Sequence, residues 1–157
     1  MKALSVHPYF AMAIAEGCKP IECRTWSTDY RGDILICSTA KKSKGTIPGH
    51  ALAIVELYDI VPFEHKYLKS ALMESSEYRT GLFAWKLRNN RIIKPIPVKG
   101  ALSLWEFTDE NKIEIIPNEL LNYTYSADEQ MSFEEYKIGE MPEPAQWFKQ
   151  NWEPIMI

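Results

Sequence analysis

A glycine between two regular patterns constrains the fold of this chain more than any other feature of its 157 residues. Residues 8–16, PYFAMAIAE, begin with a proline, which suits the first turn of a helix, and place Phe10 and Ile14 on one helical face. Gly17 follows at the position where helices commonly end in a left-handed residue. Residues 21–26, IECRTW, then alternate as a strand does. We therefore predict a helix that ends at Gly17 and leads directly into a strand.

The rest of the chain predicts short strands separated by turns. Alternating or apolar runs predict strands at 2–6, 33–39, 50–61 and 101–107. Residues 82–96 predict a β-hairpin that turns at Asn89-Asn90. Helices are predicted over 62–76 and from Pro144 to residue 152. Together these elements predict an α+β fold, a small β-barrel of about six strands with about two or three flanking helices.

Composition limits the classes of function. Apolar residues make up 46% and charged residues 25%, as in soluble globular proteins. There is no apolar run of about 18 residues and no secretory signal pattern, so we expect a cytoplasmic protein without a membrane partner. Cys18, Cys23 and Cys37 lack the spacing of metal ligands, and the 3 histidines are scattered. We therefore expect free thiols, no metal and no organic cofactor.

Charge is unevenly distributed although the net charge is only −3. Basic residues outnumber acidic ones over 1–105, and acidic residues outnumber basic ones over 106–143. A basic body is compatible with an anionic ligand. Three interpretations of the acidic segment stay open: it binds a basic protein partner, it folds over the ligand site of its own chain, or it is a solvated surface.

The strand after Gly17 carries the candidate site. Because side chains alternate in a strand, Glu22, Arg24 and Trp26 share one face, and Lys19 lies just before it. A lysine beside a carboxylate in a cleft can have a perturbed pKa and act as acid, base or nucleophile. The planar arginine fork suits a phosphate or the edge of a base. An ordinary exposed ion pair is the alternative interpretation.

Residues 17–24, GCKPIECR, match the Gly-x-Lys-x-x-Glu-x-Arg motif of the ASCH domain, a PUA-like β-barrel family associated with RNA. Residues 2–40 resemble the opening of small bacterial and phage ASCH proteins, and residues 83–107 are similar to their closing hairpin and strand. The resemblance implies an ASCH domain over 1–107, and we expect 108–157 to be an acidic extension packed on it. It also implies a cleft, lined by the motif residues, that binds RNA, a nucleotide or a nucleoside.

Hydrolysis is the alternative function. One branch of the family hydrolyses the acetyl amide of N4-acetylcytidine, using a threonine where this chain has Glu22, the motif lysine and a later glutamate. The resemblance thus leaves two functions open: binding of RNA or a modified nucleobase, or hydrolysis of a nucleoside or RNA with Lys19 and Glu22 as catalytic residues. Candidates for the later acid are Glu56, Glu64, Glu74 and Glu77.

Further ligand-binding candidates flank the motif. Ser5 ends the first strand, where its hydroxyl either faces the ligand or caps the following helix. Tyr9, Trp26 and Trp85 are candidates for stacking on a base, with core packing as the alternative. The candidate phosphate-binding residues Lys41, Lys42 and Lys44 lie in a glycine- and proline-containing loop.

Overall fold

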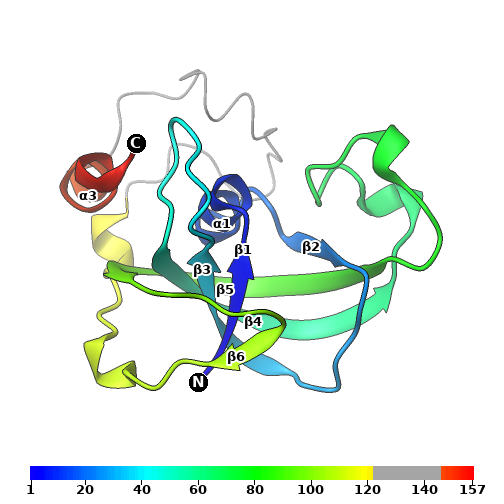
Figure 1. Cartoon of the computed structure of the whole chain (residues 1–157), viewed down its shortest axis with the longest axis horizontal. Helices are drawn as coiled ribbons and strands as arrows, with labels where there is room; N and C mark the ends of the chain where they lie inside the picture. Colours follow the sequence, from blue (N-terminus) through cyan, green and yellow to red (C-terminus); the bar gives the residue numbers. More distant parts are fainter. Residues whose placement is uncertain (122–145) are drawn as a thin grey trace.

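The computed structural model describes residues 1–121 and 146–157. A six-stranded sheet in the order β2-β5-β4-β3-β1-β6 forms the body, and it curls into a half-barrel around α1 (Figure 1). The strands are β1 (Lys2–Val6), β2 (Ile21–Arg24), β3 (Gly32–Ser38), β4 (His50–Pro62), β5 (Phe83–Pro97) and β6 (Leu104–Glu106). The helices are α1 (Pro8–Ala15), α3 (Gln146–Asn151) and the short 3-10 helices His65–Tyr67, Ser75–Glu77, Glu110–Lys112, Asn118–Leu120 and Glu153–Ile155. The predicted α+β class and six-stranded barrel architecture are confirmed.

The predicted unit of helix, glycine and strand is confirmed. α1 begins at Pro8, and the Nδ1 atom of His7 caps it by accepting the backbone N–H of Tyr9 at 3.2 Å. After the helix ends, Gly17 adopts a φ of 83°, and the N–H of Cys18 donates to the carbonyl of Ala13 at 2.9 Å. This left-handed residue reverses the chain and leads it into β2.

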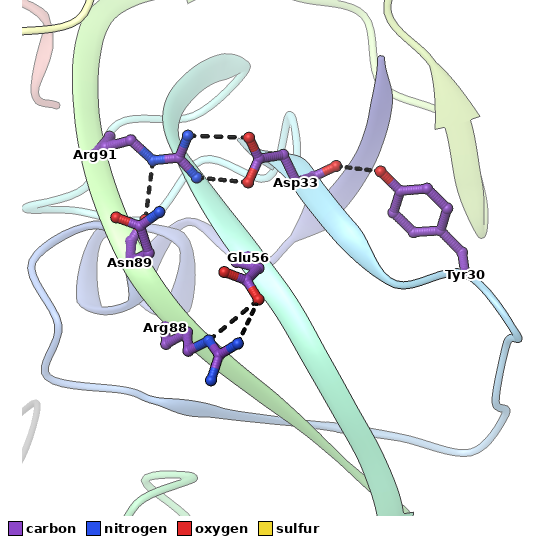
Figure 2. A network of polar contacts seen from close by, with 6 residues as sticks. All are labelled: Tyr30, Asp33, Glu56, Arg88, Asn89 and Arg91. Atoms are coloured by element: carbon purple, nitrogen blue, oxygen red, sulfur yellow. Dashed lines mark hydrogen bonds and ion pairs between the residues drawn. The ribbon is translucent and has the colours of Figure 1, made fainter.

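The predicted hairpin turn at Asn89-Asn90 is wrong, because β5 continues through both residues as one strand. Ile54 on β4 pairs with Arg91 and Glu56 pairs with Arg88, so β5 carries an extra residue there and forms a bulge. Asn89 has a φ of 53°, which asparagine tolerates, but the conformation serves the bulge instead of a turn (Figure 2). Such bulges increase the twist of the β4–β5 pair and help the sheet to curl.

Asn90 links the same bulge to the helix. Its Nδ2 atom donates to the carbonyl oxygen of Ala15 at 2.9 Å, at the end of α1. Carbonyl groups in the last turn of a helix lack partners within the helix, so this bond satisfies one of them. The bulge therefore both bends β5 and fixes the end of α1, from which the chain continues to Lys19.

The predicted helix over 62–76 is also wrong. The segment holds the 3-10 helix His65–Tyr67 and the start of the 3-10 helix Ser75–Glu77, and Leu72 between them takes a φ of 54°, which is incompatible with one continuous helix. The apolar residues that suggested helical spacing do become buried. Phe63 and Ala71 pack with apolar residues of β2 and the start of β5. The segment therefore covers one face of β2 as a series of turns.

The C-terminal segment packs on the body. Trp147 and Trp152 are buried in the main core cluster, which also contains residues of α1 and of strands β3 to β5. The N–H of Ile157 donates to the carbonyl of Thr46 at 3.0 Å, in the loop between β3 and β4. Most of the acidic segment, and the predicted helix start at Pro144, lie outside the described residues. Within the described parts of the chain, no helix is long and apolar enough to cross a membrane.

Candidate functional site

The candidate site lies where the curled sheet does not close on itself. β2 is one edge strand, and β1 lies next to the opposite edge strand, β6 (Figure 1). Arg24 on β2 donates from Nη2 to the carbonyl oxygen of Ser5 on β1 at 2.9 Å. Because β2 and β1 are not neighbours in the sheet, this bond bridges its two edges. We call the line between β2 and the β1–β6 pair the seam.

Lys19, Glu22 and Arg24 come together at this seam. Oε1 of Glu22 lies 3.6 Å from Nζ of Lys19, and its Oε2 lies 3.1 Å from Nη2 of Arg24. Oε1 also accepts the backbone N–H of Cys23 at 3.1 Å. The face of β2 that carries Glu22 is interior: Glu22 is 6% exposed and Lys19 only 2%. The result is a buried carboxylate between two cations.

Lys19 is enclosed on several sides. Its Nζ donates to the carbonyl of Ala71 and lies 4.6 Å from the ring centroid of Phe10, a cation–π geometry. Burial lowers the pKa of Lys19, and the nearby Glu22 opposes this shift only in part. A lower pKa makes the neutral, nucleophilic amine easier to form. The amine is nevertheless almost completely shielded from solvent.

Arg24 is the member of the cluster that solvent reaches. Its side chain is 23% exposed. The ion pair with Glu22 and the hydrogen bond to the Ser5 carbonyl both use the Nη2 atom. Its Nε is buried without a hydrogen-bond partner among the described residues. Leaving a buried donor unpaired costs about 1–3 kcal/mol, so the guanidinium is held in place with some of its bonding capacity unused. Of the three charged side chains, that of Arg24 is therefore the most accessible to solvent.

The other predicted residues of this region differ in exposure. Trp85 is completely buried in the main core, and its Nε1 donates to the carbonyl of Trp26 at 3.1 Å. Trp26 is half-buried, and its ring meets that of Trp85 edge to face at 4.7 Å. Ser5 is half-buried, and its Oγ accepts the Nε1–H of Trp105 at 3.1 Å. Of the two indole rings named as stacking candidates, only that of Trp26 has surface left for a ligand.

The predicted phosphate-binding loop lies beside the first turn of α1. Lys41, Lys42 and Lys44 are all exposed, and the Tyr9 hydroxyl donates to the carbonyl of Lys44 at 3.1 Å. The ring of Tyr9 stacks on that of His7, with centroids 5.2 Å apart. Burial, and to a lesser degree the charge of Lys41, lower the pKa of His7. Ser5 contacts Arg24 at the seam, and Tyr9, four residues later, contacts the lysine loop. The two regions are therefore connected by a short stretch of chain.

The four candidate later acids have separate surroundings. Glu56 forms an ion pair with Arg88 at 2.8 Å (Figure 2), and Glu64 one with Lys66 at 3.4 Å. Glu74 and Glu77 cap the 3-10 helix Ser75–Glu77 reciprocally. Burial raises the pKa of Cys23, the neighbour of Glu22, and the charges of Glu22 and Glu77 add to the effect. Among the described residues, no group of three His, Cys, Asp or Glu side chains could hold a metal ion.

Three contacts of the cluster were not anticipated from the sequence: the carbonyl of Ala71, the ring of Phe10 and the indole of Trp105. Ala71 and Trp105 lie 52 and 100 residues from their partners along the chain, and no local pattern signals such contacts. Phe10 was expected in the core face of its helix, and its position over Lys19 depends on how α1 turns into β2.

Comparison with known proteins identifies related sequences and structures. The family model of the ASCH domain matches residues 4–154. The crystal structure of ASCH from Zymomonas mobilis is similar, with a TM-score of 0.57 and 21% identity over 69% of this chain and 88% of that chain. Two single-substitution variants of the Zymomonas mobilis protein give TM-scores of 0.55 and 0.54, with 22% and 21% identity. They cover 69% of this chain and 91% and 89% of theirs. No curated protein matches the chain.

Proposed function

This chain belongs to the ASCH domain family, and we propose that it binds RNA by placing a nucleobase, modified or unmodified, at the seam beside Arg24. The ASCH domain has a PUA-like fold that is generally linked to RNA binding. The observation that carries the proposal is the Arg24 guanidinium, which is fixed by Glu22 and the Ser5 carbonyl yet partly exposed and incompletely paired.

The three charged residues then have different roles. Arg24 contacts the ligand, because its planar fork matches the acceptor edge of a base or the oxygens of a phosphate. Glu22 is too deeply buried to meet a ligand, and it orients Arg24 through their 3.1 Å contact. Lys19 balances the charge of Glu22, which leaves the cluster with a net positive charge. A positive cluster favours an anionic or acceptor-rich ligand.

The surroundings of the seam suit a nucleic acid strand. The half-buried ring of Trp26 is the candidate for base stacking, which is worth about 1–3 kcal/mol per base, whereas the ring of Tyr9 already stacks on His7. Lys41, Lys42 and Lys44 are exposed beside Tyr9, where they can contact phosphates as point charges. Binding that uses these lysines should weaken as the salt concentration rises, with a slope of about −0.7 per phosphate contact for a single strand.

Fluorescence anisotropy with short single-stranded RNAs of mixed sequence, between low and moderate salt, tests the proposal. Arg24→Ala should weaken binding at least about tenfold, and Arg24→Lys should recover only part of it because the fork is lost. Arg88→Ala is the matched control, since it removes the same charge from an arginine paired with Glu56 on β4. Equal losses in Arg24→Ala and Arg88→Ala, or no binding by the unaltered chain, would overturn the proposal. Thermal unfolding of each variant confirms that it remains folded.

Hydrolysis of a nucleoside or RNA is the second candidate function, because burial lowers the pKa of Lys19 and Glu22 lies 3.6 Å from its amine. In this alternative Lys19 is the base or nucleophile and Glu22 exchanges protons with it. Mass spectrometry of N4-acetylcytidine and RNA after incubation with the protein detects turnover. Full turnover by a folded Lys19→Met variant would exclude the lysine from catalysis. A basic protein partner for the acidic segment stays a separate proposal.

A further inference from the structure

The loop between β5 and β6, residues 98–103, carries an unusual apolar side chain. Leu102 is 92% exposed, the highest value among the large apolar residues that the structure describes. Burying a leucine side chain stabilises a folded protein, so the exposure of Leu102 forgoes that stabilisation. Single exposed leucines are common, and the significance of this one depends on how the loop is held and where it lies.

The loop is fixed on both sides of Leu102. A Cβ atom on Gly100 would lie 2.3 Å from Oγ of Ser5, so a larger residue would displace either the loop or the Ser5 side chain, which accepts a hydrogen bond from Trp105. On the other side, Leu104 pairs with Leu4 in the β1–β6 ladder. Ser103, which lies between Leu102 and Leu104, has a φ of 57°. A non-glycine residue seldom adopts this conformation without support from its surroundings. The loop therefore presents Leu102 to solvent in a defined position.

That position is at the seam. Leu102 is two residues from Gly100 and two from Leu104, so it lies within about 7 Å of each along the chain. Gly100 touches the side chain of Ser5, and the carbonyl of the same Ser5 accepts the bond from Arg24. The loop that carries Leu102 and the partly exposed guanidinium of Arg24 therefore both contact Ser5 of β1.

We propose that the 98–103 loop is one wall of the ligand site and that Leu102 packs against the face of a nucleobase whose edge is bound by Arg24. This inference rests on the RNA-binding function proposed above and narrows it. A phosphate needs only the cation, whereas a nucleobase has a flat apolar face as well as polar edges. The pairing of Leu102 with Arg24 therefore assigns a base, and not a backbone phosphate, to the seam.

Anisotropy titrations with the same RNAs test this inference. Leu102→Ala should weaken binding about five- to tenfold, as expected for losing partial burial of a leucine side chain, with an unchanged salt slope because no phosphate contact is lost. Its melting temperature should not fall, since the side chain is exposed. Leu120→Ala, which shortens another exposed leucine outside the loop, is the matched control. Gly100→Ala should also weaken binding, because the added Cβ collides with Oγ of Ser5 and displaces either the loop or the Ser5 side chain with its bond to Trp105.

The outcomes separate this inference from the function on which it rests. If Arg24→Ala loses binding while Leu102→Ala binds like Leu120→Ala, RNA binding at the seam stands and the role of Leu102 is overturned. A changed salt slope in Leu102→Ala would also contradict the assignment of a base. If the unaltered chain binds no RNA, both proposals fail together.

Discussion

Replacing Glu22 by glutamine removes the negative charge between two cations while the size of the side chain is kept. In the native protein, the carboxylate lies 3.6 Å from Nζ of Lys19 and 3.1 Å from Nη2 of Arg24. After the substitution, Arg24 remains partly exposed to water. Lys19 is buried, and among the groups described around it only the carbonyl of Ala71 and the ring of Phe10 would still stabilise its charge. We therefore expect a large loss of stability from this conservative change.

The magnitude follows from the distances and the burial. At an effective dielectric constant of about 20, each cation attracts Glu22 by about 5 kcal/mol, and the cost of removing the ions from water offsets much of this. Removing one partner of a buried pair typically costs about 3–5 kcal/mol, because an uncompensated buried charge remains. Lys19→Met should cost less, since Glu22 would keep Arg24 and the N–H of Cys23. The double variant should cost less than the sum of the two single changes.

Urea unfolding followed by the fluorescence of the 5 tryptophans measures these free energies. Glu106→Gln is the control, because Glu106 forms an exposed ion pair with Lys2 at 2.8 Å and its loss should leave the midpoint unchanged. The electrostatic account of the cluster is refuted if Glu22→Gln costs less than about 1 kcal/mol, the usual limit for an exposed pair. A larger cost for Lys19→Met than for Glu22→Gln would also refute it.

Three smaller effects can be checked with the same protein. The Arg91 guanidinium holds the pKa of Asp33 below 3.8 (Figure 2), so Asp33→Asn should cost about 0.5–1 kcal/mol above that pH. That cost should disappear as the pH falls through the lower folded pKa, and a cost that stays constant in acid would contradict it. Asn90→Ala should lower stability by about 1 kcal/mol, measured by thermal unfolding, because the carbonyl of Ala15 loses its donor. Burial raises the pKa of Cys37 to about 12, so alkylation mapped by mass spectrometry should leave this thiol unmodified until the protein unfolds.

The elements that the sequence predicted correctly depend on local signals. Pro8, Gly17 and the alternation of 21–26 act within a few residues of the structures that they specify. Asn89 failed as a turn signal because a hairpin and a bulge use the same positive φ. The choice between them depends on β4, which is long enough to pair with β5 on both sides of the bulge. The local sequence of residues 82–96 does not indicate that β4 is the pairing partner of this segment.

For the candidate site, too, the sequence predicted the local arrangement of the residues but not their tertiary surroundings. Strand alternation correctly placed Glu22 and Arg24 on one face of β2, with Lys19 just before the strand, and the structure brings the three charged groups together. Alternation does not say what covers a face, and here both faces of β2 are covered. The turns of 63–82 cover the face with Ile21, and Lys19, whose Nζ lies over the ring of Phe10 in α1, lies against Glu22 on the other face. The alternative of an exposed ion pair does not hold for Lys19 and Glu22, whose burial only the tertiary structure reveals.

The position of this polar face explains why charged residues occur in a strand that is buried on both sides. A sheet that closed fully would pair β2 with the opposite edge through backbone hydrogen bonds and leave no edge groups for a ligand. Here the link across the seam is a side chain, Arg24, that reaches the Ser5 carbonyl. Such a link needs a counter-charge on its own strand, which Glu22 provides, and Glu22 in turn needs compensation in the interior, which Lys19 provides. The Lys-Glu-Arg spacing thus places a charge-compensated carboxylate and a partly exposed guanidinium where the two sides of the half-barrel meet.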